Sequence, residues 1–202
     1  MQIIAHLNHE ELIEKKSRFI CYLFRVTTEA DVNNYLQQIK KEHYKARHHC
    51  YAYIINQNQM KASDDGEPTG TAGIPILETL QQNHLEQTLA IVVRYFGGIK
   101  LGTGGLNRAY RQATANAIKE TGMVEVVEKQ VVKITISYAL NDEFQYFCQT
   151  HQLTITDIAY DTAVHLTLTI NQVSKLTTLL DQYFYNQYQL TKLGFQTVEI
   201  PI

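Results

Sequence analysis

The chain has 202 residues, of which 45% are hydrophobic, and a formal net charge of −2 at pH 7. This length suits one or two domains with packed cores, and the near-neutral charge excludes a globally basic nucleic-acid binder and a chain with an acidic tail. The three cysteines, Cys21, Cys50 and Cys148, are far apart and form no C-x-x-C pair, which excludes a disulfide framework and a cysteine-rich zinc site.

The N-terminal segment carries His, Asn and Glu among its apolar residues, unlike a signal peptide, and no apolar run reaches membrane-spanning length. Together with the unpaired cysteines, this predicts a cytoplasmic protein. Charge is distributed unevenly: residues 1–127 hold 14 Lys and Arg against 13 Asp and Glu, and the remainder holds 4 against 7. A polyanion would therefore prefer the first part of the chain.

The N-terminal part alternates strand and helix signals. Residues 18–26, RFICYLFRV, are rich in aromatic and branched side chains, which predicts a strand. Thr27 or Thr28 supplies an N-cap for a helix over 29–43, whose apolar side chains recur at helical spacing. Residues 50–55 predict a second strand, followed by a polar turn and a short edge strand. This order indicates an α+β domain.

Eight of the ten glycines lie within residues 63–111. The stretch opens with the turn SDDGEP and continues into a helix, which must start near 71–74 because Pro75 is tolerated only in a first helical turn. Residues 89–93, LAIVV, are continuously apolar and predict a strand buried on both faces. A GIKLGTGG loop follows, and apolar side chains at helical spacing then predict a helix over 104–121.

From residue 128 glycine nearly vanishes and the pattern becomes strand, helix, strand, strand, helix, strand. This βαββαβ order within about 75 residues is typical of a ferredoxin-like domain. The sequence thus predicts two domains, 1–127 and 128–202, each with its own set of apolar faces, and we expect them to fold separately.

The glycine-rich loop is the candidate binding site. Loop amides and a helix N-terminus point toward an anion, and nearby cations can complete its charge balance. The predicted residues are the glycines and cations of the loop and the following helix, which are Arg94, Gly97, Gly98, Lys100, Gly102, Gly104, Gly105, Arg108 and Arg111. The loop matches neither the P-loop nor the dinucleotide fingerprint, so the alternative is a tight strand-to-helix connection packed on the domain.

The acidic turn beside this loop has two interpretations. Asp64, Asp65 and Glu67 could hold a divalent cation, or they could form a turn whose acids complement the dipole of the next helix. We expect the second, with no metal and no cofactor. His48 and Tyr95 are candidates for an aromatic-edged binding surface rather than for a metal pair, because the neighbours His48 and His49 face opposite sides of a strand.

No residue lies in a sequence motif typical of a catalytic nucleophile. There is no G-x-S-x-G motif, and none of the serines lies in a glycine-rich turn that would expose it. The sequence therefore predicts no catalytic residues, and a non-enzymatic protein is favoured.

Four motifs, KKSRF at 15–19, HHCYAY at 48–53, SDDGEPTGTAG at 63–73 and VRYFGGIKLGTGGLNRAY at 93–110, resemble the IMPACT/YigZ family of small cytoplasmic proteins. The resemblance implies an N-terminal sheet with helices on one face, similar to a ribosomal-protein and elongation-factor domain fold. It also implies that the ferredoxin-like domain is similar to the last domain of the translocating elongation factor. By the same resemblance, eukaryotic relatives regulate translation by binding a ribosome-associated activator of the amino-acid-starvation kinase. They also carry a different N-terminal domain that this chain lacks, so this partner is not expected here.

Two functions follow from these patterns. The first is a translation-related binding module that contacts RNA or the ribosome, or a protein partner of that machinery, through the basic glycine-rich loop. The second is an enzyme acting on a nucleotide or another phosphorylated small molecule, for which the glycine loop and the acidic turn are the only support. Fold analogy does not decide between them.

Overall fold

The computed structural model describes residues 1–202, and its contacts divide the chain into two compact units. The first comprises residues 1–126 with 199–202, and the second comprises residues 127–198. The last four residues therefore group with the first unit, where Arg25 pairs with Glu199 at 2.7 Å and the Ile202 amide donates to the Met123 carbonyl at 3.3 Å. No helix is long and apolar enough to cross a membrane.

The first unit is built on a five-stranded antiparallel sheet with the order β2-β3-β6-β4-β5. Its strands are β2 (Asn8–Glu14), β3 (Ser17–Arg25), β4 (His48–Asn56), β5 (Gln59–Ser63) and β6 (Thr88–Tyr95). Its helices are α1 (Glu29–Glu42), α2 (Gly73–Gln82) and α3 (Gly102–Thr121), and a short β1 (Gln2–Ile4) pairs with the start of β7.

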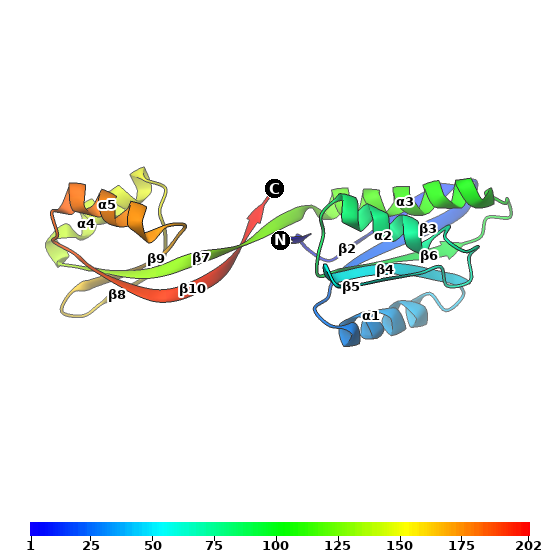
Figure 1. The fold of residues 1–202 in the computed structure, drawn as a ribbon, viewed down its shortest axis with the longest axis horizontal. Coiled ribbons are helices and arrows are strands. Elements are labelled where there is room, and N and C mark those ends of the chain that lie inside the picture. The colour runs from blue at the N-terminus through cyan, green and yellow to red at the C-terminus, as the bar shows by residue number, and fades with distance from the viewer. The chain divides into compact units, whose positions relative to one another are not determined.

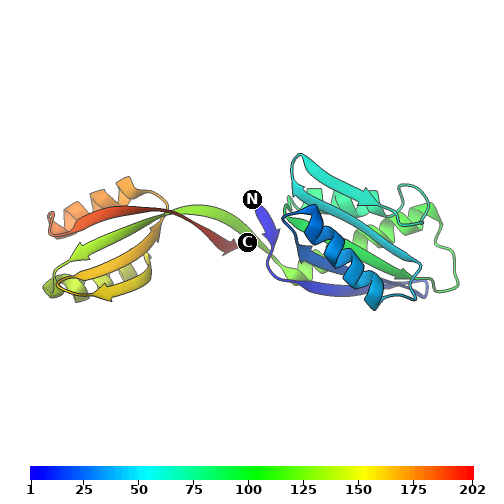
Figure 2. The same cartoon turned by 90° about the horizontal axis from the view of Figure 1, so that it is seen from below.

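Helices cover both faces of this sheet (Figures 1 and 2). The expectation of helices on one face describes α2 and α3, which pack over one side, whereas α1 lies on the other. The central strand β6 explains why two layers form, since it is buried on both faces. Ala90 and Val92 join the core under α2 and α3, and Leu89 and Ile91 join the core under α1.

Two local features differ from the sequence prediction. Strands β1 and β2 were not predicted, because β2 is a polar edge strand, NHEELIE, whose side chains are mostly exposed or half-buried. Helix α3 begins at Gly102, two residues earlier than predicted, so Gly102 and Thr103 belong to the helix rather than to the loop. The N-cap of α1 is Thr28, in a capping box with Asp31.

The second unit is a ferredoxin-like βαββαβ domain, as predicted. Its elements are β7 (Met123–Ile136), a 3-10 turn (Tyr138–Leu140), α4 (Asn141–Thr150), β8 (Thr154–Tyr160), β9 (Val164–Ile170), α5 (Val173–Phe184) and β10 (Gln189–Pro201). The strand order is β10-β7-β9-β8, and the two helices cover one face of the sheet (Figure 1). Alternating side chains of β7 and β9 pack there against Phe144 and Leu180.

All three cysteines are buried and free. Cys21 and Cys50 are 0% exposed in the first unit, and Cys148 is 1% exposed in the second. Burial raises the pKa of both the Cys21 and the Cys148 thiol to about 12.

Candidate functional site

The acidic turn after β5 is held by its own carboxylates. Asp64 accepts hydrogen bonds from the amides of Gly70, Ala72 and Gly73 at 2.8, 3.0 and 2.8 Å, and the last two lie at the start of α2. Burial alone would raise the pKa of Asp64, but these three donors outweigh it and hold the pKa below its usual value. Asp64 is thus the anion at the N-terminus of α2.

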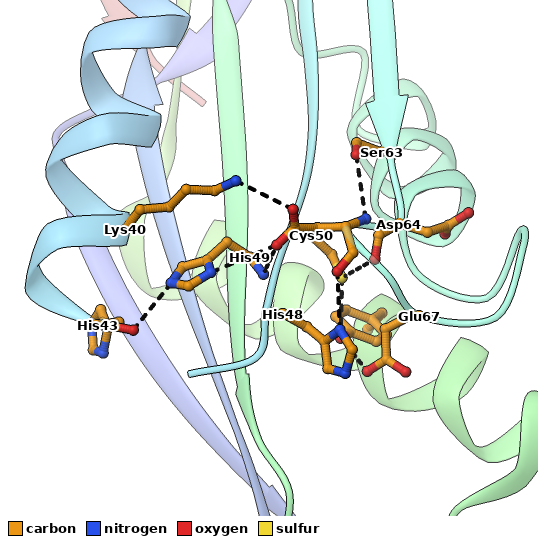
Figure 3. A network of polar contacts seen from close by, with 10 residues as sticks. Lys40, His43, His48, His49, Cys50, Ser63, Asp64 and Glu67 are labelled. Carbon is orange, nitrogen blue, oxygen red and sulfur yellow. Dashed lines mark hydrogen bonds and ion pairs between the residues drawn. The ribbon is translucent and has the colours of Figure 1, made fainter. Parts of the chain in front are cut away.

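Asp65 ties the turn to β4 and α1. Its carboxylate accepts from the His49 amide at 2.7 Å and pairs with Lys40 at 3.2 Å, while its carbonyl lies 3.0 Å from Nδ1 of His48. His49 points to the other face, where its Nε2 lies 3.2 Å from the His43 carbonyl (Figure 3). The two rings therefore point to opposite sides of the strand, as expected for adjacent strand residues, and both reach Asp65, whose carboxylate lies 3.6 Å from Nδ1 of His49.

Glu67 is the centre of a buried polar network. Its Oε1 accepts from Nη1 of Arg94 at 2.6 Å and from the Tyr110 hydroxyl at 2.9 Å, and the ion-pair side chains are only 3% and 7% exposed. Sγ of Cys50 lies 3.3 Å from Oη of Tyr110 and 2.9 Å from the Asp64 carbonyl. Burial raises the pKa of both the Tyr110 hydroxyl and the Cys50 thiol, which keeps both groups protonated.

This network changes the predicted role of Arg94. The sequence analysis placed it among the cations that balance the charge of a bound anion. Even-numbered side chains of β6 point under α3, however, so Arg94 is buried, with its charge balanced by Glu67. The remaining donors of Arg94 are unusual, because Nε is buried with no hydrogen-bond partner and Nη2 has no protein acceptor.

A cavity of about 390 Å³ opens next to this ion pair. Its walls come from the acidic turn, the end of β6, the glycine loop and the start of α3, and the lining residues are Glu67, Pro68, Arg94, Phe96, Lys100, Leu101, Gly102, Thr103 and Leu106. Of the predicted site residues, the cavity brings together Glu67, Arg94, Lys100 and Gly102.

The start of α3 faces this cavity without a cap. Gly102 has a φ of +71°, which glycine adopts without strain, and no side chain caps the helix. No protein oxygen accepts a hydrogen bond from the amides of Gly102, Thr103 and Gly104, and the first turn contains no acidic residue. The helix therefore presents free N–H donors and the positive end of its dipole.

Exposed cations surround this helix start. Lys100 and Arg108 are exposed and make no ion pair. Lys15 and Lys16 form the two-residue turn between β2 and β3, both with positive φ, and Gly97 packs on the Lys16 backbone so closely that a Cβ would lie 2.0 Å from its carbonyl carbon. We call these four residues, Lys15, Lys16, Lys100 and Arg108, the basic surface.

Several predicted residues lie elsewhere. Arg111 was predicted as a cation of the anion site but forms an ion pair with Glu78 of α2. Tyr95 points to the α1 face, where its hydroxyl lies 2.9 Å from Nδ1 of His43. Asp64 and Asp65 hold the turn, and His48 packs against Gly66 of that turn.

The sequence analysis did not single out Phe96 or Thr103. Phe96 is 55% exposed beside the cavity, and the Arg94 guanidinium lies 5.7 Å from the centroid of its ring. The sequence did offer a signal for Phe96, because a large aromatic residue lies directly between a strand predicted to be buried and two glycines. Lys15 and Lys16 belonged to a quoted motif but were not assigned to the site.

The fold and site define a class: a two-domain α+β protein with a glycine-rich, uncapped helix start beside a buried ion pair, followed by a ferredoxin-like domain. Residues 15–118 match the Impact N-terminal domain, and residues 134–182 match a domain of unknown function, DUF1949. The chain belongs to the IMPACT family.

Relatives carry the same family name. The chain is 41% identical over 159 residues to "IMPACT family member YvyE" of Bacillus subtilis, covering 78% of this chain and 73% of the relative. An "IMPACT family member" of Haemophilus influenzae is also 41% identical, over 162 residues, covering 78% and 79%. A crystal structure of a hypothetical protein matches with a TM-score of 0.60 and 29% identity, over 96% of this chain and 97% of that one.

Proposed function

We propose that the protein is a non-enzymatic, translation-related module that binds RNA, alone or within the ribosome, through the basic surface at the start of α3. The observation that carries this proposal is the set of four exposed lysine and arginine side chains around free helix amides. A cationic surface with free N–H donors favours phosphate groups, because both the charges and the dipole attract anions.

The four residues of the basic surface lack ion-pair partners, as do Lys41 and Lys119, but they differ from those lysines in lying together around the start of α3. Arg18, Arg25 and Lys40 of the same unit each pair with a carboxylate, whereas Lys15, Lys16, Lys100 and Arg108 do not. Their mutual repulsion is relieved when an anion binds between them. The net charge of −2 of the whole chain is compatible with this, since binding depends on the local surface.

The test is RNA binding measured against salt. Each phosphate neutralised on a single strand contributes about −0.7 to the slope of log K against log salt. Replacing Lys100 and Arg108 by alanine should reduce the magnitude of this slope by roughly one to two and leave the fold intact. Anisotropy of a fluorescein-labelled single-stranded RNA, titrated at several salt concentrations, measures the slope.

The matched control is Lys41→Ala with Lys119→Ala. Both lysines are exposed, lie in the last turns of α1 and α3, and make no ion pair, so the net charge changes by the same amount. This control should bind RNA with the parent slope. Equal losses in both double variants would indicate a nonspecific charge effect, and an absence of RNA binding by the parent at low salt would refute the proposal. Magnesium-dependent nucleotide turnover by the parent would favour the enzymatic alternative.

A further inference from the structure

We propose that the cavity at the start of α3 binds a nucleoside phosphate, with the phosphate between Arg94 and the first helix amides and the base against Phe96. When the nucleotide belongs to an RNA strand, this inference rests on the RNA-binding function proposed above and identifies its central subsite. When the nucleotide is free, the cavity acts independently of the basic surface. The chemistry recognised is the same in both cases.

The first observation is the incomplete hydrogen bonding of Arg94. Its guanidinium carries five N–H donors in a fixed planar fork, yet Glu67 is its only carboxylate partner and Nε is buried without any partner. Arg94 is 7% exposed and lines the cavity. A buried donor without an acceptor is rare in folded proteins. Because Nε itself is shielded from solvent, an oxyanion in the cavity is bound by the outer edge of the guanidinium, at Nη2, for which the chain supplies no acceptor.

The second observation is the convergence of positive charge on the same space. Glu67 neutralises Arg94, which leaves Lys100 and the positive end of the α3 dipole as the net field in the cavity. The amides of Gly102, Thr103 and Gly104 have no protein acceptor. Several donors from different directions suit the oxygens of a tetrahedral phosphate better than the two coplanar oxygens of a carboxylate.

The third observation is the apolar remainder of the wall. Pro68, Phe96, Leu101 and Leu106 line the cavity opposite the polar groups. A small anion alone would leave this wall in water. Phe96 is 55% exposed and offers a ring face on which a base can stack. A cavity of about 390 Å³ is within the usual range for small-molecule sites. A phosphate joined to a flat ring suits both the polar groups and the apolar wall of this cavity.

The test uses Thr103→Glu in the full chain, with Thr103→Gln as the size-matched neutral control. Thr103 is exposed in the first turn of α3, and a carboxylate there complements the dipole and occupies the phosphate position with negative charge. T103E should therefore melt at or above the parent temperature, so that lost binding does not reflect misfolding. The probes are uridine monophosphate, uridine and inorganic phosphate by calorimetry, and a fluorescein-labelled single-stranded oligouridylate by anisotropy.

T103E should weaken uridine monophosphate and oligouridylate at least tenfold, and T103Q should stay within about threefold of the parent. Phe96→Ala should weaken uridine monophosphate about fivefold or more, as removal of a base-stacking ring does, and leave inorganic phosphate unchanged. Uridine without phosphate should bind far more weakly than its monophosphate.

The outcomes separate the two proposals. Unchanged binding of both probes by T103E, with RNA binding reduced in the Lys100 and Arg108 variant, overturns the cavity and retains RNA binding by the surface. Uridine monophosphate bound by the parent and lost in T103E, without any RNA binding, supports the cavity for free nucleotides and overturns the RNA function. Failure of the parent to bind either probe overturns both.

Discussion

Helices α2 and α3 pack on the same face of the first sheet, and both begin near a glycine-containing turn. They differ in whether the chain itself supplies an acceptor for the amides of the first helical turn. The amides at the start of α2 donate to the Asp64 carboxylate, which the chain supplies from nine residues away or less. The amides at the start of α3 have no acceptor from the chain. The contrast teaches that this protein provides an internal anion where the fold needs one and leaves the other helix start open.

Glu67 lines the same cavity and is the acidic residue that could have capped the N-terminus of α3. Its Oε1 is instead directed at Arg94 and Tyr110. The acid therefore fixes an arginine rather than capping a helix. Because Glu67 is used in this ion pair, the positive end of the α3 dipole, which a helix cap would have neutralised, stays uncompensated in the cavity.

The largest expected effect comes from Glu67→Gln. Removing one partner of a buried ion pair leaves an uncompensated charge and costs about 3 to 5 kcal/mol of unfolding free energy. Chemical denaturation of the full chain measures the loss. Adding Arg94→Met to Glu67→Gln should recover most of it, because an apolar side chain then replaces the unpaired charge. A single variant within 1 kcal/mol of the parent would contradict the description of this pair as structural.

An intermediate effect is expected for Asp64→Asn. Asparagine keeps one acceptor oxygen but loses the charge, so we expect a loss of about 1 to 2 kcal/mol, typical of a weakened helix cap. Asp65→Asn is the comparison, since Asp65 does not cap α2 and should cost less. Equal losses in the two variants would argue against a special role for Asp64.

The same variant gives a pH dependence. Because the pKa of Asp64 is lowered in the folded chain, the contribution of its charge is complete above the unfolded pKa of about 3.9 and is lost as pH falls through the folded value. The difference between parent and Asp64→Asn should thus be constant from about pH 5 to 7 and shrink below about pH 4. Burial also lowers the pKa of His43 and His49, which destabilises both proteins alike below about pH 6.5 and cancels in the difference.

The smallest expected effect, that of Thr103→Glu, tests the difference between the starts of α2 and α3 directly. Thr103→Glu supplies the missing anion at α3 and should stabilise the protein by about 0.3 to 1 kcal/mol at low salt, with the gain decreasing as salt rises. Thr103→Gln should produce no such salt-dependent gain. Thermal melting at two salt concentrations is sufficient. A destabilised glutamate variant would show that the start of α3 already has an anionic neighbour.

Local patterns predicted most elements of the fold. The apolar run of β6, the spacing of α3 and the βαββαβ order needed only short-range information. The polar strand β2 was missed because an edge strand buries little and shows weak alternation. The apolar run of β6 predicted burial on both faces, but the placement of α1 alone on one face was not predicted, because it depends on how the helices cross the sheet rather than on any local pattern.

The sequence predicted that the acidic turn lies beside the glycine loop, but not the partners of the charged residues there. The glycine cluster and the acidic turn do lie together. The burial of Arg94 depends on which face of β6 it occupies and on Glu67, 27 positions away, and the pairing of Arg111 with Glu78 depends on the packing of α2 on α3. Such long-range partners leave no local signature, so Arg94 and Arg111 were assigned to the candidate anion site rather than to ion pairs within the fold.

The buried cysteines provide a built-in measure of local opening. A thiol with a pKa of about 12 contains almost no thiolate at neutral pH, and the thiolate is the reactive form. Alkylation therefore reports transient exposure through local or global unfolding. Since Cys21 and Cys50 belong to one unit and Cys148 to the other, peptide mass spectrometry after pulsed alkylation follows the opening of each unit in the same unmodified molecule.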